Sequence, residues 1–245
     1  MRQRLDQALV DRGLARSRSR AADLIRRGLV SVEGRAAEKT SELVCAEAVL
    51  AVSGAEAGLV SRGGLKLTAA LETFCFDPAG RIALDVGAST GGFTQVLLMR
   101  GAEKVYAVDT GHDQLDAGLR ADPRVVSLEG TNARDLDRSL IPEPVGILVA
   151  DVSFVSLTKV LEPPLALTAA GAILVALVKP QFEVGRAGIG KGGIVRDEAL
   201  RMKAVGDVKA FLAAQPGWRV IGAIPSPIAG GSGNLEFLIG ARRDD

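Results

Sequence analysis

The sequence predicts an α/β protein in which a mostly parallel sheet with an antiparallel last strand follows a small α+β unit. From about residue 61 onward, apolar β-rich runs alternate with helical patterns, which is typical of a parallel sheet covered on both faces. Residues 1–60 hold only two short helical patterns and two short β-rich runs. We therefore expect two domains, at residues 1–60 and 61–245.

The helices of the first domain are marked by their ends. An apolar pattern at residues 5–10 stops before Gly13, and a second one stops at Gly28. Ser17 or Ser19 can cap the start of the second helix. Two short strands are expected after it, at residues 30–32 and 48–53.

The elements of the second domain follow the same alternation. The Pro- and Gly-rich segment 225–234 is shorter than the dozen or more residues that a parallel crossover needs, so the last strand should run antiparallel to its predecessor. Strands are expected at residues 82–86, 104–108, 125–128, 146–150, 172–178, 219–224 and 235–239. Helices are expected at residues 66–74, 93–100, 157–167 and 197–214.

Composition excludes several classes of protein. With 245 residues, 47% of them hydrophobic, and a net charge of +1, the chain is neither disordered nor fibrous. Cys45 and Cys75 are the only cysteines, too few for a disulfide framework or a four-cysteine zinc site, which favours a reducing cytoplasm and no metal. The N-terminus carries charges throughout, and the longest nearly apolar run, 165–178, is shorter than the ~20 residues of a membrane helix. We expect no membrane association.

Charge is unevenly distributed along the chain. Residues 1–30 contain eight arginines against three aspartates, a net charge of +5, whereas the remainder carries −4. Clustered arginines favour a polyanionic partner such as RNA, and a solvated helical face is the alternative. The candidate RNA-binding residues are Arg4, Arg16, Arg18, Arg20, Arg26 and Arg27, together with Arg62 near the start of the second domain.

Five charged residues are predicted to meet at one edge of the sheet. Asp109, Asp151 and Lys179 follow the second, fourth and fifth strands, at the carboxyl ends where open α/β sheets bind ligands. Glu236 lies at the start of the antiparallel strand, and Lys66 lies near the start of the helix that precedes the first strand, so both belong to the same edge. Two lysines close to three carboxylates indicate a site, although any single member could be a salt-bridge partner.

A glycine-rich turn follows the first strand of the second domain. The spacing DxGxxxGG places Asp85, Gly87, Gly91 and Gly92 before a helix, where glycine allows close approach of a ligand and the helix N-terminus offers free amides. Asp109 closes the next strand, in the position where an acid binds a ribose. Nicotinamide and S-adenosylmethionine cofactors both satisfy these features. The glycine pattern and the antiparallel last strand favour S-adenosylmethionine, and hence a Rossmann-like methyltransferase sheet.

Both domains resemble known families. The N-terminal pattern RLDxxLxxxG followed by SRAADLIRRGLVSVEG is similar to the RNA-binding domain of the ribosomal protein S-four type. DVGASTGGFT, VADVSFVSL, LVKPQFEVGRAGIGKGGIVRD and NLEFL resemble the TlyA family of haemolysin-named proteins, which have an FtsJ-like catalytic domain. That resemblance implies a catalytic tetrad of Lys66, Asp151, Lys179 and Glu236. The expected cofactor-binding residues are Asp85, Gly87, Ser89, Gly91, Gly92, Phe93 and Asp109, with Asn132 carried over from the resemblance.

The resemblance implies S-adenosylmethionine-dependent 2′-O-ribose methylation of ribosomal RNA, free or in ribosomal subunits. A ribose hydroxyl is a poor nucleophile, so we assign Lys179 to accept its proton or to stabilise the developing negative charge. Lys66 and Glu236 are expected to orient the ribose, and Asp151 to position Lys179. The alternatives are an RNA-binding adaptor with an inactive methyltransferase fold, a membrane-active haemolysin, and an NAD-dependent dehydrogenase.

The segment GRAGIGKGG carries an incomplete phosphate-loop pattern. Gly185, Gly190 and Lys191 fit GxxxxGK, but Gly192 stands where Ser or Thr would bind magnesium, so a nucleotide triphosphatase is not expected. A mobile loop with Arg186, Lys191 and Arg196 that closes over RNA backbone is one interpretation, and a solvent loop is the other. The single histidine, His112, is expected at the surface or beside the cofactor, without a catalytic role.

Overall fold

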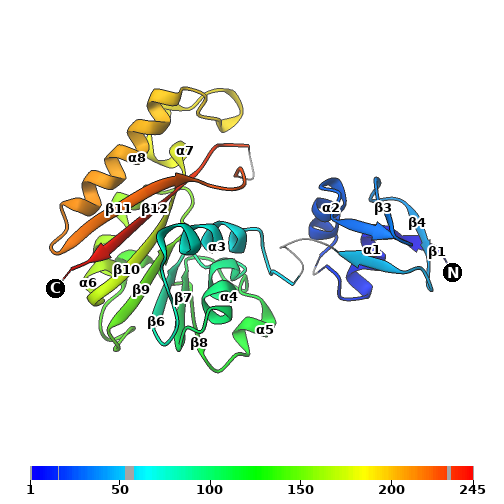
Figure 1. Ribbon diagram of the computed structural model, residues 1–245, viewed down its shortest axis with the longest axis horizontal. Coiled ribbons are helices and arrows are strands. Elements are labelled where there is room, and N and C mark those ends of the chain that lie inside the picture. The colour runs from blue at the N-terminus through cyan, green and yellow to red at the C-terminus, as the bar shows by residue number, and fades with distance from the viewer. Residues whose placement is uncertain (1, 16, 53–57, 231–232, 245) are drawn as a thin grey trace. The chain divides into compact units, whose positions relative to one another are not determined.

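The computed structural model describes residues 2–15, 17–52, 58–230 and 233–244. The chain divides into two compact units, residues 1–60 and 61–245 (Figure 1). Each unit has a hydrophobic core of its own, built in the first from residues between Leu5 and Ala48 and in the second from residues between Leu84 and Ala241. No helix in the described part of the chain is long and apolar enough to cross a membrane.

The N-terminal unit is a small α+β fold, as predicted. Ser17 caps the second helix by accepting a hydrogen bond from Arg20 N, and the strand at 30–32 pairs antiparallel with the strand at 50–52. The sequence does not predict a further pair, β1 with β4, or the two-residue β3, because such short strands lack a clear alternation. The elements are β1 Arg2–Arg4, α1 Leu5–Asp11, α2 Arg18–Arg26, β2 Val30–Val32, β3 Arg35–Ala36, β4 Leu43–Cys45 and β5 Leu50–Val52.

The second unit is built on a seven-stranded mixed sheet with the order β11-β12-β10-β9-β6-β7-β8. The pairs from β10 through β9, β6 and β7 to β8 are parallel, and β12 runs antiparallel to both of its neighbours, β10 and β11. The predicted fold class and its antiparallel last strand are therefore confirmed. The strands are β6 Ile82–Val86, β7 Lys104–Asp109, β8 Val125–Glu129, β9 Val145–Ala150, β10 Thr168–Val178, β11 Trp218–Pro225 and β12 Phe237–Arg243.

Helices cover both faces of this sheet (Figure 1). One face packs against α6 and α8, because alternate residues of the central strands share a core with Leu165 and Val208. The other face carries α3 and α4, whose buried residues include Leu67 and Leu97. The α-helices are α3 Gly63–Phe74, α4 Gly92–Met99, α5 Ala117–Arg120, α6 Glu162–Ala166, α7 Pro180–Glu183 and α8 Glu198–Ala213. The described residues of the unit also form the 3₁₀ turns η1 Ala133–Asp135, η2 Leu157–Lys159, η3 Arg186–Gly188 and η4 Lys191–Gly193.

One predicted helix is split, and two predicted strands differ by four residues at one end; the last strand, expected at 235–239, is β12 at Phe237–Arg243. The single helix expected at 157–167 is split into η2 and α6, and the prolines at 163 and 164 stand in the first turn of α6, where their missing amides cost no helical hydrogen bond. The fifth strand begins four residues earlier than expected, at Thr168, with a register irregularity before Ile173. None of these differences changes the edge at which β9 and β10 end.

Strand register brings the ends of three strands together at that edge. Val178, the last residue of β10, is paired with Phe237, the first residue of β12. Lys179 and Glu236 therefore occupy adjoining positions just beyond this pair. Asp151 directly follows β9, the parallel neighbour of β10.

Candidate active site

The glycine-rich turn packs tightly against the end of β9. Gly87 has φ +86°, and a Cβ atom built on it would lie 2.5 Å from the carbonyl oxygen of Asp151. A side chain at position 87 would therefore force apart the turn and the Asp151 backbone. Gly91 is the N-cap of α4, with φ +94°. As at the start of any α-helix, the first amides of α4 have no intrahelical partner.

Asp85 lies beneath this turn and not in the cavity above it. Its carboxyl group is completely buried, and one oxygen accepts a hydrogen bond of 2.6 Å from Thr94 Oγ1. Burial, only partly offset by that hydrogen bond, raises the pKa of Asp85 to about 7. The structure therefore does not support direct contact between Asp85 and a bound cofactor, which the sequence had suggested, because the side chain is enclosed between β6 and α4.

Asp109 joins the glycine turn to the next loop. Its two carboxylate oxygens accept hydrogen bonds from the backbone amides of Ser89 and Gly111, at 2.8 and 2.7 Å. Glu129, at the end of β8, accepts from the amides of Gln114 and Leu115, which lowers the pKa of this glutamate. The two acids thus fix the loop at 110–115 beside the turn.

The four predicted tetrad residues lie as two ion pairs at the edge of the sheet. Lys66 Nζ is 2.6 Å from Glu236 Oε2, and Lys179 Nζ is 2.6 Å from Asp151 Oδ1. Lys179 also donates to Ser153 Oγ at 2.7 Å. These side chains are largely buried, the most exposed being Asp151 at 22%. Each ammonium is thereby held in one orientation by a carboxylate from another element.

Glu236 is the innermost member of the four. Its side chain is 3% exposed, and a Cβ atom on Gly230 would lie 2.3 Å from its second carboxylate oxygen. The glycine at position 230 therefore leaves the room that this carboxylate occupies. Glu236 therefore acts on the site through Lys66, with which it forms an ion pair.

Two adjoining cavities lie over the turn and the ion pairs. A cavity of about 310 Å³ is lined by Lys66, Asp151 and Lys179, and by Ser61, Arg62, Ile228 and Ala229. A larger one of about 540 Å³ is lined by polar groups of the 109–114 loop and by the apolar Val152, Val155 and Val160. Of the predicted cofactor residues, Gly87 and Ser89 line both cavities, Gly92 and Phe93 line the smaller, Asp109 and Asn132 line the larger, and Asp85 and Gly91 line neither.

The predicted RNA-binding arginines differ in what they contact. Arg4 and Arg18 are about half exposed and both pair with Asp6. Arg20 and Arg27 both lie against Asp23, with 15% and 30% of their side chains exposed, and Arg26 donates to Ala22 O. Arg16 lies outside the described residues. Arg62 lines the smaller cavity of the second unit.

The sequence did not single out several residues that belong to the site. Ser153 is the hydroxyl partner of Lys179. Phe154 is 91% exposed, has φ +65°, and places its ring 5.2 Å from that of Phe182. A phenylalanine four residues beyond a strand end in VADVSF was the available signal, but its exposure depends on a backbone conformation that sequence patterns do not reveal.

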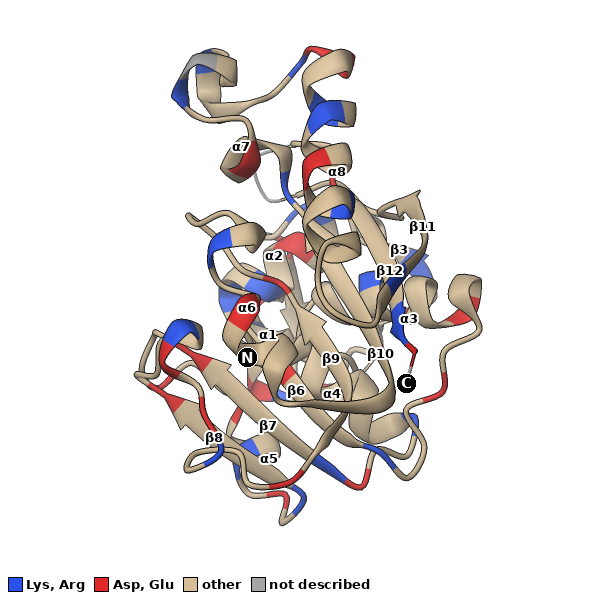
Figure 2. Cartoon of the chain, turned by 90° about the vertical axis from the view of Figure 1, so that its left-hand side faces the viewer, with Lys and Arg blue, Asp and Glu red and all other residues tan. Residues whose placement is uncertain are grey.

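The glycine-rich segment forms the turns η3 and η4 and does not form a phosphate loop leading into a helix. The side chain of Asn234 attaches it to the start of β12, since Oδ1 accepts from Val195 N and Nδ2 donates to Gly193 O. Basic residues lie along this connection between α7 and α8 (Figure 2). His112 is exposed in the loop after β7. Among the described residues, no group of three or more His, Cys, Asp or Glu side chains is placed to hold a metal ion.

Comparison with known families agrees with this architecture. Residues 59–243 match the FtsJ-like methyltransferase family, and residues 3–50 match the S4 domain. The fold and the site thus define a methyltransferase that carries an S4 domain.

Individual relatives extend along nearly the whole chain. A 16S/23S rRNA (cytidine-2′-O)-methyltransferase, TlyA, from Mycobacterium tuberculosis is 49% identical over 98% of this chain and 90% of its own length. Hemolysin A of Brachyspira hyodysenteriae is 39% identical over 96% of this chain and 98% of its own. A solved structure from Streptococcus thermophilus, 40% identical, superposes with a TM-score of 0.77 and covers 100% of this chain and 89% of that one. The chain belongs to the TlyA family of FtsJ-like methyltransferases.

Proposed function

We propose that this protein transfers a methyl group from S-adenosylmethionine to the 2′ hydroxyl of a ribose in ribosomal RNA. The observation that carries the proposal is the two buried lysine–carboxylate ion pairs beside the glycine turn, of which Lys66, Asp151 and Lys179 line one cavity. The name of the M. tuberculosis relative supports ribosomal RNA as the substrate and a cytidine as its target. Because the proposed substrate is ribosomal RNA, we propose that the reaction takes place in the cytoplasm.

The two cavities suit the cofactor. Together they offer a narrow polar part beside free helix amides and a wider part with Asp109, Asn132 and apolar side chains. Asp109 is placed to accept ribose hydroxyls, and Val152, Val155 and Val160 give an apolar surface for a purine. When bound, S-adenosylmethionine supplies a methyl group on a positively charged sulfur that is also a good leaving group.

The chain must then supply an activated oxygen. We assign Lys179 to the 2′ hydroxyl, where its Nζ accepts the proton or stabilises the negative charge that develops on oxygen. Asp151 and Ser153 fix the direction of that ammonium, which limits the freedom lost on reaching the reactive geometry. We assign Lys66, held by Glu236, to orient the ribose.

We expect exposed residues around the two cavities to contact the RNA. Phe154 lines the larger cavity and is 91% exposed, so it presents an aromatic face on which a base can stack. Arg186, Lys191 and Arg196 lie along the connection before α8, where they can contact phosphates. The S4 domain adds a second, basic surface.

The test is transfer of tritium from methyl-labelled S-adenosylmethionine to purified ribosomal RNA or ribosomal subunits. We expect label on RNA, and resistance of the labelled position to alkali, because a 2′-O-methyl group removes the nucleophile that alkali uses. RNA binding without label would favour an inactive adaptor, and reduction of NAD without label would favour a dehydrogenase. Lysis of red cells without label would favour a haemolysin.

A further inference from the structure

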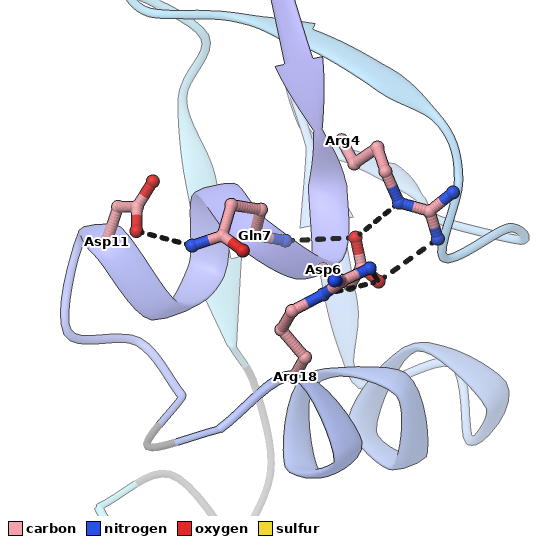
Figure 3. A network of polar contacts seen from close by, with 5 residues as sticks. All are labelled: Arg4, Asp6, Gln7, Asp11 and Arg18. Carbon is pink, nitrogen blue, oxygen red and sulfur yellow. Dashed lines mark hydrogen bonds and ion pairs between the residues drawn. The ribbon is translucent and has the colours of Figure 1, made fainter.

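One buried carboxylate in the N-terminal unit holds two arginines that come from different elements (Figure 3). Asp6 accepts from Arg4 Nε and Nη2 at 3.0 and 3.1 Å, and from Arg18 Nε and Nη2 at 3.3 and 2.9 Å. The amide of Gln7 also donates to it, at 3.0 Å. Arg4 lies at the end of β1 and Arg18 at the start of α2, so the contact fixes a strand and a helix with respect to each other.

The arginines keep much of their surface free for a ligand. Asp6 is 7% exposed, whereas the side chains of Arg4 and Arg18 are 46% and 56% exposed. A guanidinium carries five N–H donors in a rigid plane, and each of these two uses only one edge for Asp6. Within the described part of the chain, no other hydrogen bond from either guanidinium group is found. Two guanidinium groups this close would repel each other without the carboxylate between them.

We infer that Asp6 is a positioning residue for RNA binding, which presets Arg4 and Arg18 as a fixed pair of phosphate-binding guanidinium groups. This inference rests on the proposed function, since it takes RNA as the ligand. The physical reason is that an arginine already held in its binding orientation loses less side-chain freedom when it meets a phosphate. The low pKa of Asp6, about 2 because of its hydrogen bonds to Arg4, keeps the carboxylate charged throughout the neutral range.

Other basic residues of the same unit are placed differently. Arg12 donates to the carbonyl oxygens of Cys45, Ala46 and Ala48, so its guanidinium supports the chain before β5. Arg20, which lies against Asp23, is only 15% exposed. The pair around Asp6 is therefore better exposed to a ligand than these residues are.

Asp6→Asn should change the affinity for RNA in the direction opposite to the one expected from charge alone. Asp6→Asn removes a negative charge from a basic surface, so charge alone would tighten RNA binding. We expect instead about tenfold weaker binding of the full-length variant to deproteinised ribosomal RNA, the loss of one charge-assisted contact. Asp11→Asn is the matched control, because it makes the same charge change at an exposed position at the end of α1, where the carboxylate accepts from Gln7. That control should bind RNA as tightly as the wild type or more tightly.

The arginine variants show whether Asp6 acts through these two side chains. Arg4→Gln and Arg18→Gln should each weaken binding and lower the dependence of log Kd on log salt by about one. Combined with either of them, Asp6→Asn should cost less than it does alone, because one of the two residues that Asp6 positions is already gone. Arg18→Lys keeps the charge and lies at the surface, so it tests the fixed geometry even if Asp6→Asn does not fold; it too should weaken binding. Thermal melting identifies variants that are folded at the assay temperature.

Unchanged or tighter RNA binding by a folded Asp6→Asn protein would overturn the inference. So would full additivity with the arginine variants, or wild-type binding by Arg18→Lys. Binding is measured without S-adenosylmethionine, so a chain that failed to methylate RNA would still give a readable answer. Conversely, an Asp6→Asn chain should reach the wild-type kcat once RNA is saturating.

Discussion

Lys179 is held by two groups at once, and this constraint gives it a specific place in the proposed reaction. Its ammonium lies 2.6 Å from Asp151 and 2.7 Å from Ser153, while the side chain is only 11% exposed. We expect Lys179→Ala to lower the methylation rate by about 10²- to 10⁴-fold, the span usual for a positioned proton-transfer group. Affinity for S-adenosylmethionine, measured by calorimetry, should stay near that of the wild type. Near-normal turnover by this variant would remove Lys179 from the mechanism.

Phe154 combines an exposed aromatic ring with a backbone conformation that disfavours it. A phenylalanine that is 91% exposed at φ +65° contributes little to the core and occupies a strained region of backbone space. We expect Phe154→Ala to lower kcat/KM for RNA about tenfold through lost base stacking, without changing affinity for S-adenosylmethionine. Phe154→Trp should retain activity.

A glycine variant separates this effect from folding. Phe154→Gly should unfold at a higher denaturant concentration than Phe154→Ala, because glycine adopts positive φ without strain. It should still be as poor a methyltransferase as the alanine variant. Full activity in either small variant would show that the ring has no part in RNA binding.

At the scale of the elements, the side chain of Asp85 lies between β6 and α4 and has a strongly raised pKa. Burial raises the pKa of Asp85 to about 7 from an ordinary value of 3.8. The folded chain therefore keeps this proton over a pH range in which the unfolded chain releases it, and the free energy of unfolding falls as pH rises through that range. Asp85→Asn cannot titrate there. Denaturant unfolding should show the stability of the wild type falling relative to this variant between about pH 4 and pH 7.

Asp122 provides the opposite case as a control. Hydrogen bonds from Arg124 lower its pKa to about 2, so its contribution to stability is present above pH 3.8 and is lost only as pH falls toward 2. The stability difference between wild type and Asp122→Asn should stay constant between pH 4 and pH 7. A constant difference for Asp85→Asn as well would contradict the raised pKa.

Strand direction was enough to predict where the site lies. The contacts within the site depend on local detail and were not predicted. A short Pro- and Gly-rich connection forces β12 to run antiparallel, which predicts that Glu236 and Lys179 lie at one edge; the register of Val178 with Phe237 agrees. The sequence did not predict that Lys179 would bond to Ser153, or that Asp85 would be enclosed under the turn. Those contacts depend on side-chain directions within a few residues, which alternation and spacing do not determine.

At the scale of the whole molecule, the two units are packed independently. The core of residues 1–60 and the core around the seven-stranded sheet are built from different residues. The basic segment lies in the first unit, whereas both cavities lie in the second. Each unit therefore has the internal packing that a domain needs to fold by itself.

Removal of the S4 domain should separate these two functions. A chain that begins at Ser61 keeps α3, the glycine turn and all four charged site residues, so it should fold and bind S-adenosylmethionine as tightly as the full protein. Its kcat/KM for ribosomal RNA should fall by about 10²-fold, because the RNA contacts of one domain no longer raise the effective concentration of the other. Lowering the salt concentration should raise the activity of the shortened chain less than that of the full one, since fewer phosphate contacts remain. A shortened chain with the full kcat/KM would show that the first unit takes no part in substrate binding. A shortened chain without affinity for S-adenosylmethionine would show that the second unit is incomplete without the first.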